Sequence, residues 1–163
     1  MRRSFRAVDS KKDVSSKIRH WCARAERSPA QVRRKLLSWD EAKLADGLIA
    51  SLKDEGYLDE RRFAEAYAAD HIRLRGWGPF KVLSALRVEH GIPDSLAEGA
   101  IARIADHDVL EAGRRAVRKR RQGRSDEPVA DTIGALMRRG FPLDVAREAV
   151  AAEVAPPKFD PSC

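Results

Sequence analysis

The fold is decided by residues 78–93, GPFKVLSALRVEHGIP, because their pattern recurs later in the chain. A proline opens this stretch, two apolar residues follow at helical spacing, and a Gly-apolar-Pro turn closes it. The first copy has Pro79, Val82, Leu86 and Gly91-Ile92-Pro93; the second has Pro128, Ile133, Leu136 and Gly140-Phe141-Pro142; and Pro29, Val32 and Leu36 repeat the opening near the start. Self-similarity at a period of roughly 50 residues predicts a tandem array of small units, which builds surfaces for binding partners.

The repeated prolines and glycines predict where helices begin and end, since proline fits the first turn and glycine fits the left-handed residue after the last turn. No run alternates convincingly with a period of two, so we predict no sheet. The expected fold is all-α, with three tandem three-helix repeats that form an elongated, curved modular array. The expected parts are a flexible basic tail over residues 1–14, repeats over 15–57, 58–105 and 106–155, and a disordered tail over 156–163.

Two details of the helices follow from the apolar spacing. The first helix is expected from about Ser15 to Glu26, and Leu37 and Leu74 are expected to face inward with the other apolar residues of their helices. In the first repeat, residues 38–41 read SWDE and lack the glycine turn of the other two repeats. The start of the third helix is therefore left open.

Composition excludes several classes of protein. No stretch approaches the roughly 18 apolar residues of a membrane span, and the basic N-terminus is followed by charged residues, unlike a secretory signal. The two cysteines, Cys22 and Cys163, have no C-x-x-C partner. We expect reduced thiols and a cytoplasmic location without membrane contact.

Catalytic chemistry finds little support in the sequence. None of the four histidines lies four residues from another, and no Gly-rich phosphate loop follows an expected strand. Cys22 lies on an apolar face and is interpreted as a core residue. We expect no catalytic residues, no cofactor and no metal.

The charge is strongly uneven, with a formal net charge of +7. Residues 1–35 carry a net +9 and residues 73–125 a net +6, while the stretches that follow them are acidic. Basic blocks favour an anionic partner, although an arginine-rich helix can be only a solvated face. From charge alone the two interpretations stand about even.

Two clusters are the candidate binding sites. The first surrounds a tryptophan between glycines and contains Arg73, Arg75, Trp77 and Lys81. Trp77 could stack on a base, dock into a pocket of a partner protein or fold back over the core. The second is a run of cations in residues 114–124, from which we select Arg114, Arg115, Arg118, Lys119 and Arg121; a weaker third group is Arg33, Arg34 and Lys35. Arg114, Arg118 and Arg121 share one helix face and repel each other, so a polyanion would relieve them. Reversing these three to Glu is expected to weaken binding and leave melting nearly unchanged.

Three segments of the sequence resemble those of a known protein family. Residues 56–64, GYLDERRFA, resemble the signature of RecX regulatory proteins, the bacterial modulators of the RecA recombinase. Residues 25–36, AERSPAQVRRKL, are similar to the first-repeat segment of that family, and residues 138–141, RRGF, to the ending of its third repeat.

The resemblance implies a function without catalysis. A RecX-like protein is expected to bind in the groove of the RecA–DNA filament, to contact single- or double-stranded DNA, and to inhibit ATPase activity, strand exchange and the SOS response. We expect a monomer that serves DNA repair and recombination. The alternatives are a free-standing helical protein that binds naked DNA with the same arginines, and a small hydrolase with an unrecognised site.

Overall fold

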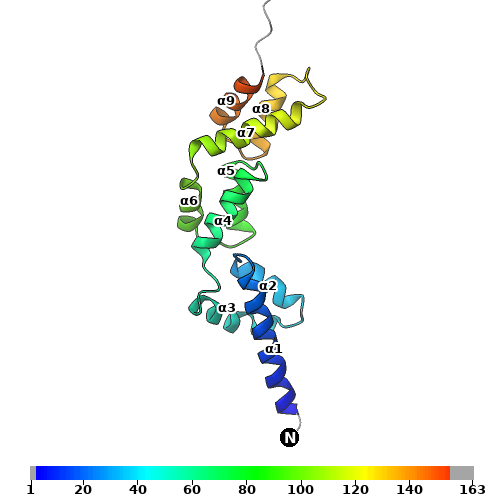
Figure 1. Cartoon of the computed structure of the whole chain (residues 1–163), viewed down its shortest axis with the longest axis vertical. Helices are drawn as coiled ribbons and strands as arrows, with labels where there is room; N and C mark the ends of the chain where they lie inside the picture. The colour runs from blue at the N-terminus through cyan, green and yellow to red at the C-terminus, as the bar shows by residue number, and fades with distance from the viewer. Residues whose placement is uncertain (1–2, 155–163) are drawn as a thin grey trace, which may run out of the picture. The chain divides into compact units, whose positions relative to one another are not determined.

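The computed structural model describes residues 3–154 and contains nine α-helices and no strand within that range (Figure 1). The all-α prediction is confirmed. The helices are α1 (Arg3–Ala23), α2 (Pro29–Leu37), α3 (Ala45–Asp54), α4 (Glu60–Arg73), α5 (Pro79–Val88), α6 (Asp94–Ala102), α7 (Asp106–Arg121), α8 (Val129–Arg138) and α9 (Leu143–Glu153), with a short 3-10 helix η1 (Ala42–Leu44) before α3. The expected disordered tail over 156–163 lies outside the described residues. No described helix is long and apolar enough to cross a membrane.

The N-terminal helix begins much earlier than expected. We expected a helix from about Ser15 preceded by a flexible tail, whereas α1 begins at Arg3. A periodic pattern of apolar residues indicates a helix that buries one face, and residues 3–13 have no such pattern. The pattern therefore gave no sign of this part of the helix.

Glycines in the left-handed conformation follow the ends of four helices, as the sequence predicts. Gly56, Gly76, Gly91 and Gly140 all have positive φ. After the last two, the amide of the next residue donates back to its helix, from Ile92 to the Leu86 carbonyl at 2.9 Å and from Phe141 to the Leu136 carbonyl at 3.2 Å. Ile92 and Phe141 are both buried, so each turn also closes the core.

In the first repeat, Asp40 takes the left-handed turn position that glycine occupies in the other two repeats. Its φ is 59°, and the next amide, that of Glu41, donates to the Leu36 carbonyl at 2.9 Å. Asp is among the residues that tolerate the left-handed region best after glycine and Asn. The 3-10 helix follows, so the third helix of this repeat begins at Ala45.

The helices pack into two compact units, each with its own core. The first contains the described part of residues 1–66 together with 86–97, and the second contains 67–85 together with the described chain from 98. The core of the first includes Ile18, Val32, Leu36, Ile49 and Leu52. The three repeats describe the order of the helices along the chain. They do not coincide with the two units, because α4, α5 and α6 each contribute residues to both units.

Two apolar residues depart from the expected pattern. Leu37 is 63% exposed and Leu74 is 79% exposed, so the expectation that both face inward is wrong. Leu37 is the last residue of α2 and follows the buried Leu36, which places it on the other side of the helix. Leu74 is the first residue after α4, although its amide still donates to the Asp70 carbonyl at 2.9 Å.

In the second unit, α9 packs most extensively on α7 and also contacts α8. Glycine makes the close approach possible, because a Cβ at Gly113 of α7 would lie 3.2 Å from the Cβ of Ala149 on α9. Val117, Leu136 and Phe141 are almost completely buried between these helices. The three C-terminal helices, α7, α8 and α9, therefore pack around one core.

Candidate nucleic-acid interface

A basic groove of about 740 Å³ lies in the second unit, between the C-terminal end of α4, the C-terminal half of α7 and the end of α8. Seven of its lining residues are Lys or Arg, and none is Asp or Glu. The cations are Arg75, Arg115, Lys119, Arg120, Arg124, Arg138 and Arg139. We call this surface the basic groove.

Two of these arginines hold the end of α4 in place. Arg115 Nη2 donates to the Arg73 carbonyl at 2.6 Å, and Arg139 donates to the carbonyls of Gly76 at 3.1 Å and Arg75 at 3.3 Å. The last carbonyls of a helix lack partners within the helix and carry the negative end of its dipole. Arg115 and Arg139 therefore have a structural role in the wall of the groove.

A direct contact between two turns sets the position of that wall. The amide of Gly78 donates to the Arg139 carbonyl at 2.8 Å, and the amide of Phe80 donates to the Gly140 carbonyl at 3.0 Å. A Cβ at Gly78 would lie 2.1 Å from the carbonyl carbon of Gly140, so only glycine fits. This contact places Arg75, before the first turn, on the same groove as Arg139, at the start of the second.

Arg120 and Arg121 fix the loop after α7. Arg120 makes a two-bond ion pair with Glu127 at 2.6 and 2.8 Å, and the buried Thr132 donates to the same carboxylate at 2.9 Å. These hydrogen bonds, first that from Arg120, lower the pKa of Glu127. Arg121 donates to the carbonyls of Ser125 and Glu127.

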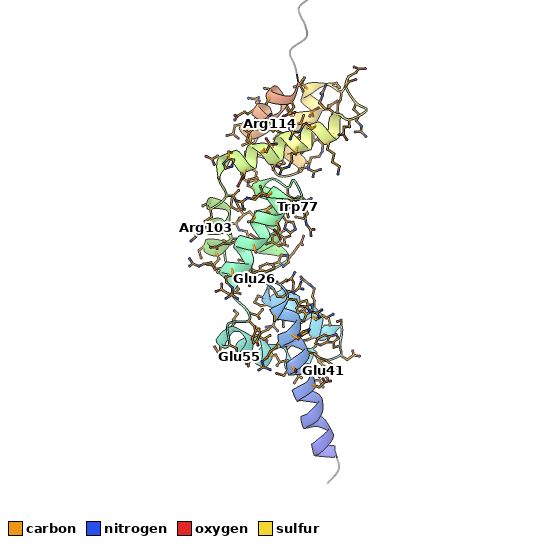
Figure 2. The ribbon with its side chains drawn as sticks, in the orientation of Figure 1. Glu26, Glu41, Glu55, Trp77, Arg103 and Arg114 are labelled. Atoms are coloured by element: carbon orange, nitrogen blue, oxygen red, sulfur yellow. The ribbon has the colours of Figure 1, made fainter. Side chains whose placement is uncertain are left out.

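Arg114 and Arg118 are paired with acids. Both donate to Glu153 of α9 at 2.7 Å, and both also contact Glu111, Arg118 at 2.7 Å and Arg114 at 3.4 Å (Figure 2). The hydrogen bond from Arg118 lowers the pKa of Glu111. The repulsion expected on this face is therefore relieved within the protein.

Trp77 and Lys81 pack within the second unit and do not line the groove. Trp77 is half-buried, with its ring 4.7 Å from the His71 ring and the Lys81 ammonium 4.1 Å from its centroid (Figure 2). Arg73, expected beside it, forms an ion pair with Asp108 at 2.8 Å. Of the stretch around Trp77, Leu74, Arg75 and Gly76 line the groove.

The third group of predicted cations lies on α2, in the first unit. Arg33 pairs with Asp46 at 2.6 Å, and Arg34 donates to the Glu89 carbonyl at 3.0 Å. The Lys35 ammonium lies 5.2 Å from the Trp39 ring centroid and 5.9 Å from that of Trp21. These three residues are thus engaged within their own unit.

The structure brings together three of the predicted residues, Arg75, Arg115 and Lys119, and adds four that the prediction omitted. Arg120 and Arg124 belong to the basic run of residues 114–124, whereas Arg138 and Arg139 lie far from it in sequence. One signal could have identified the last pair: Arg75-Gly76 and Arg139-Gly140 each place an arginine before the glycine that ends a helix. Among the described residues, no group of three or more His, Cys, Asp or Glu side chains is arranged to hold a metal ion.

The chain is similar to known proteins over most of its length. The family model described as RecX, second three-helix domain, matches residues 59–101. The regulatory protein RecX of Thermus thermophilus is 35% identical over 127 residues, which cover 78% of this chain and 82% of that protein. The RecX of Halorhodospira halophila is 39% identical over 111 residues, covering 64% and 65%. The crystal structure of RecX from Lactobacillus salivarius has the same fold, with a TM-score of 0.72 at 20% identity over 90% of this chain and 97% of that one.

Proposed function

This chain belongs to the RecX family of regulatory proteins, and we propose that it binds the RecA–DNA filament and lowers the ATPase and strand-exchange activity of the recombinase. It acts as a monomer in the cytoplasm, and it damps the DNA-damage response by limiting the active filament. The partners are the recombinase and the DNA that the recombinase holds.

The observation that carries this proposal is the basic groove on a member of this family. The DNA of the filament carries a negative charge on each phosphate, and a groove lined by seven cations, of which Arg120 is paired with Glu127, would be attracted to it. The cations come from three helix ends that packing and backbone hydrogen bonds hold in place. Such a surface is suited to docking on a charged assembly.

Two buried side chains of nucleophilic residue types, Cys22 and Ser28, are consistent with regulation without catalysis. Burial raises the pKa of the Cys22 thiol to about 11, so the thiol is protonated at neutral pH. Ser28 is fully buried and caps α2, where its hydroxyl accepts from the Gln31 amide. Neither residue is placed to attack a substrate.

The test is the ATPase rate of RecA on single-stranded DNA, measured as the purified chain is added. We expect the rate to fall at chain concentrations at or below that of the recombinase, together with strand exchange. Unchanged ATPase rate, strand exchange and filament length at an equimolar ratio would overturn the proposal.

A second measurement separates filament binding from the alternative, sequestration of naked DNA. The recombinase is assembled first, and bare single-stranded DNA is then added in excess as a competitor. Inhibition that persists supports binding to the filament. Inhibition that the competitor abolishes favours the free-standing DNA-binding protein.

A further inference from the structure

The basic groove has the size and part of the lining of a small-molecule site. Its volume of about 740 Å³ falls within the roughly 300–1,000 Å³ of typical ligand pockets. Besides its cations, the groove is lined by Leu74, Ala116, Ala135 and Leu136, of which the last two are buried core residues. The groove therefore combines its charge with a hollow that is partly apolar.

Four cations of the groove are available to a ligand. They are exposed, and their side chains have no hydrogen-bond or ion-pair partner in the part of the chain whose side chains the structure describes. The other arginines of the lining differ, because Arg115 and Arg139 bind backbone carbonyls and Arg120 pairs with Glu127. We call the available four the free cations: Arg75, Lys119, Arg124 and Arg138.

The free cations reach the groove from four segments, namely the turn after α4, the last turn of α7, the loop after α7 and the end of α8. Like charges around one hollow repel each other, and no Asp or Glu of the described chain lines it to offset that cost. Phosphates of a DNA strand are spread along its backbone, whereas those of a polyphosphate are joined directly and concentrate their charge. A compact polyphosphate can therefore meet several free cations at once.

Two further lining residues suit the base of a nucleotide. Leu74 is 79% exposed and offers apolar surface to a flat ring. Gln122 is exposed as well, and its amide carries both donors and an acceptor, which match the mixed donors and acceptors on the edge of a base. An inorganic phosphate chain would make use of neither residue.

We propose that the basic groove binds a nucleoside polyphosphate, with the phosphates on the free cations and the base against Leu74. The wall of the site is ordered before the ligand arrives, because Arg115 and Arg139 hold the end of α4, and this order lowers the entropic cost of binding. A bound nucleotide occupies cations that a larger polyanion would otherwise meet, so it acts as a small-molecule regulator of the chain. The inference goes beyond the proposed function and needs no recombinase.

The first test measures small ligands on the full chain, without recombinase or DNA. Isothermal titration calorimetry at physiological salt, with EDTA present, compares ATP, AMP and inorganic tripolyphosphate. ATP is expected to bind with a Kd below about 100 µM, and AMP at least about 10-fold more weakly, because AMP has a single phosphate to meet the cations. A weaker Kd for ATP, or equal binding of AMP, would overturn the site.

Tripolyphosphate separates the two parts of the ligand. It carries at least as much charge as ATP but has no base, and it is expected to bind at least about 5-fold more weakly, because no apolar surface is covered. Leu74→Gln is expected to weaken ATP binding by at least about 3-fold and to leave tripolyphosphate binding unchanged. Tripolyphosphate that binds as tightly as ATP, or equal effects of Leu74→Gln on both, would overturn the place of the base.

Two variants with equal charge changes locate the phosphates. The control variant removes four exposed cations outside the groove, and the groove variant removes the free cations. The control carries Arg24→Gln, Lys43→Gln, Arg61→Gln and Arg147→Gln, and the groove variant carries Arg75→Gln, Lys119→Gln, Arg124→Gln and Arg138→Gln.

Circular dichroism and thermal melting establish that both variants are folded. The groove variant is expected to bind ATP at least about 10-fold more weakly than wild type, because several charged contacts are lost. The control variant is expected to bind ATP as wild type does. Equal losses in the two variants, or wild-type affinity in the groove variant, would overturn the assignment of the phosphates to the free cations.

Mg²⁺ tests how the phosphates are neutralised. Mg²⁺ sites use carboxylates together with substrate phosphates, and the lining of the groove, all of it within the described residues, has no carboxylate. Excess Mg²⁺ is therefore expected to weaken ATP binding, since the metal neutralises phosphate charge that the free cations would meet. Tighter binding with Mg²⁺ would overturn neutralisation by the free cations.

The outcomes also separate this inference from the proposed function. A chain that binds ATP through the groove but has no effect on RecA supports the site and overturns the proposed function. A chain that inhibits RecA but does not bind ATP overturns this inference and leaves the proposed function in place.

Discussion

Gly78 and Gly140 lie in backbone contact, although they belong to different three-helix repeats. Gly78 is at the turn before α5 and Gly140 at the turn before α9, and a Cβ on Gly140 would lie 2.4 Å from the Lys81 amide nitrogen. Two backbone hydrogen bonds join the turns, so neither backbone can retreat without losing them. The absence of two side chains is thus what allows the wall of the basic groove to form.

Gly78→Ala is expected to destabilise the protein by more than about 3 kcal/mol, because the new methyl group would overlap backbone atoms. Gly99→Ala is the matched control, since Gly99 lies inside α6 and a Cβ added there would have nothing within 4 Å. The control is expected to stabilise by up to about 1 kcal/mol, as alanine is the better helix former. Urea unfolding followed by circular dichroism measures both, and a Gly78→Ala variant as stable as wild type would contradict the contact.

Reversing Arg114 and Arg118 to Glu is expected to lower Tm, because the new carboxylates would face Glu111 and Glu153. The sequence alone suggested that such reversals would leave melting nearly unchanged, and the ion pairs with α9 change that expectation. Adding Glu153→Arg should recover part of the lost Tm by restoring opposite charges.

Lys119→Glu with Arg138→Glu provides the control for the reversal. It changes the net charge equally, but these residues line a groove without acids. Thermal melting should show a smaller decrease for this pair, since each reversal removes a like charge from the groove but places a carboxylate at the C-terminal end of a helix. A Tm decrease equal to that of the Arg114 and Arg118 reversals would mean that the pairs with α9 contribute nothing specific.

The Arg19–Glu55 pair should make the first unit sensitive to acid. Arg19 donates to both carboxylate oxygens of Glu55 at 2.6 Å, and this bonding, with a further hydrogen bond from Ser51, lowers the pKa of Glu55 to about 2 (Figure 2). A lowered pKa in the folded state stabilises the fold above the pKa of an unfolded glutamate, about 4.3, and this contribution is lost as the pH falls toward 2.

Glu55→Gln tests this dependence. The Tm difference between wild type and variant should be constant above about pH 5 and should shrink toward zero as the pH approaches the folded-state pKa. Glu148→Gln is the control, at an exposed residue of α9 without an ion pair among the described residues. A Tm difference for Glu55→Gln that does not change between neutral and acid pH would contradict the pairing.

Ser28→Ala is expected to cost about 1–2 kcal/mol of stability, the upper range for loss of an N-cap. Ser28 and Gln31 form a reciprocal capping box at the start of α2, and the Ser28 hydroxyl also lies 3.1 Å from His90 Nδ1. The substitution removes both contacts, and Ser28 is fully buried, so water cannot replace them. Ser84→Ala, on the exposed side of α5, should change stability by no more than a few tenths of a kcal/mol. Chemical denaturation compares the two, and equal effects would contradict the buried role of Ser28.

Helix ends were predictable from the sequence because their signals are local. Pro29 and Pro79 begin α2 and α5, and Gly56, Gly91 and Gly140 take the left-handed conformation that the pattern requires. Each of these residues restricts or frees its own backbone, so a single sequence is enough to recognise the effect.

The groove was not predictable, because neutralisation of a charge depends on distant residues. Spacing alone offers Glu111 as a partner for Arg114, but it cannot show that Glu153 lies beside both Arg114 and Arg118. In the same way, the contact of Arg139 with the carbonyls of Arg75 and Gly76 joins parts of the chain that only the fold brings together. Several arginines of the most basic run in the sequence are therefore neutralised by ion pairs within the protein.

The contact between the two glycine turns also determines how the chain can be divided for study. A fragment that stops after α6 would leave the amides of Gly78 and Phe80 without their acceptors and would lack two of the three helix ends that form the groove. A fragment that starts at α7 would lose Arg75 and expose the Gly140 turn. The lining of the groove runs from Leu74, just after α4, to Arg139, so a piece that retains it must span that range, and dissection at the repeat boundaries would separate residues that belong to one surface.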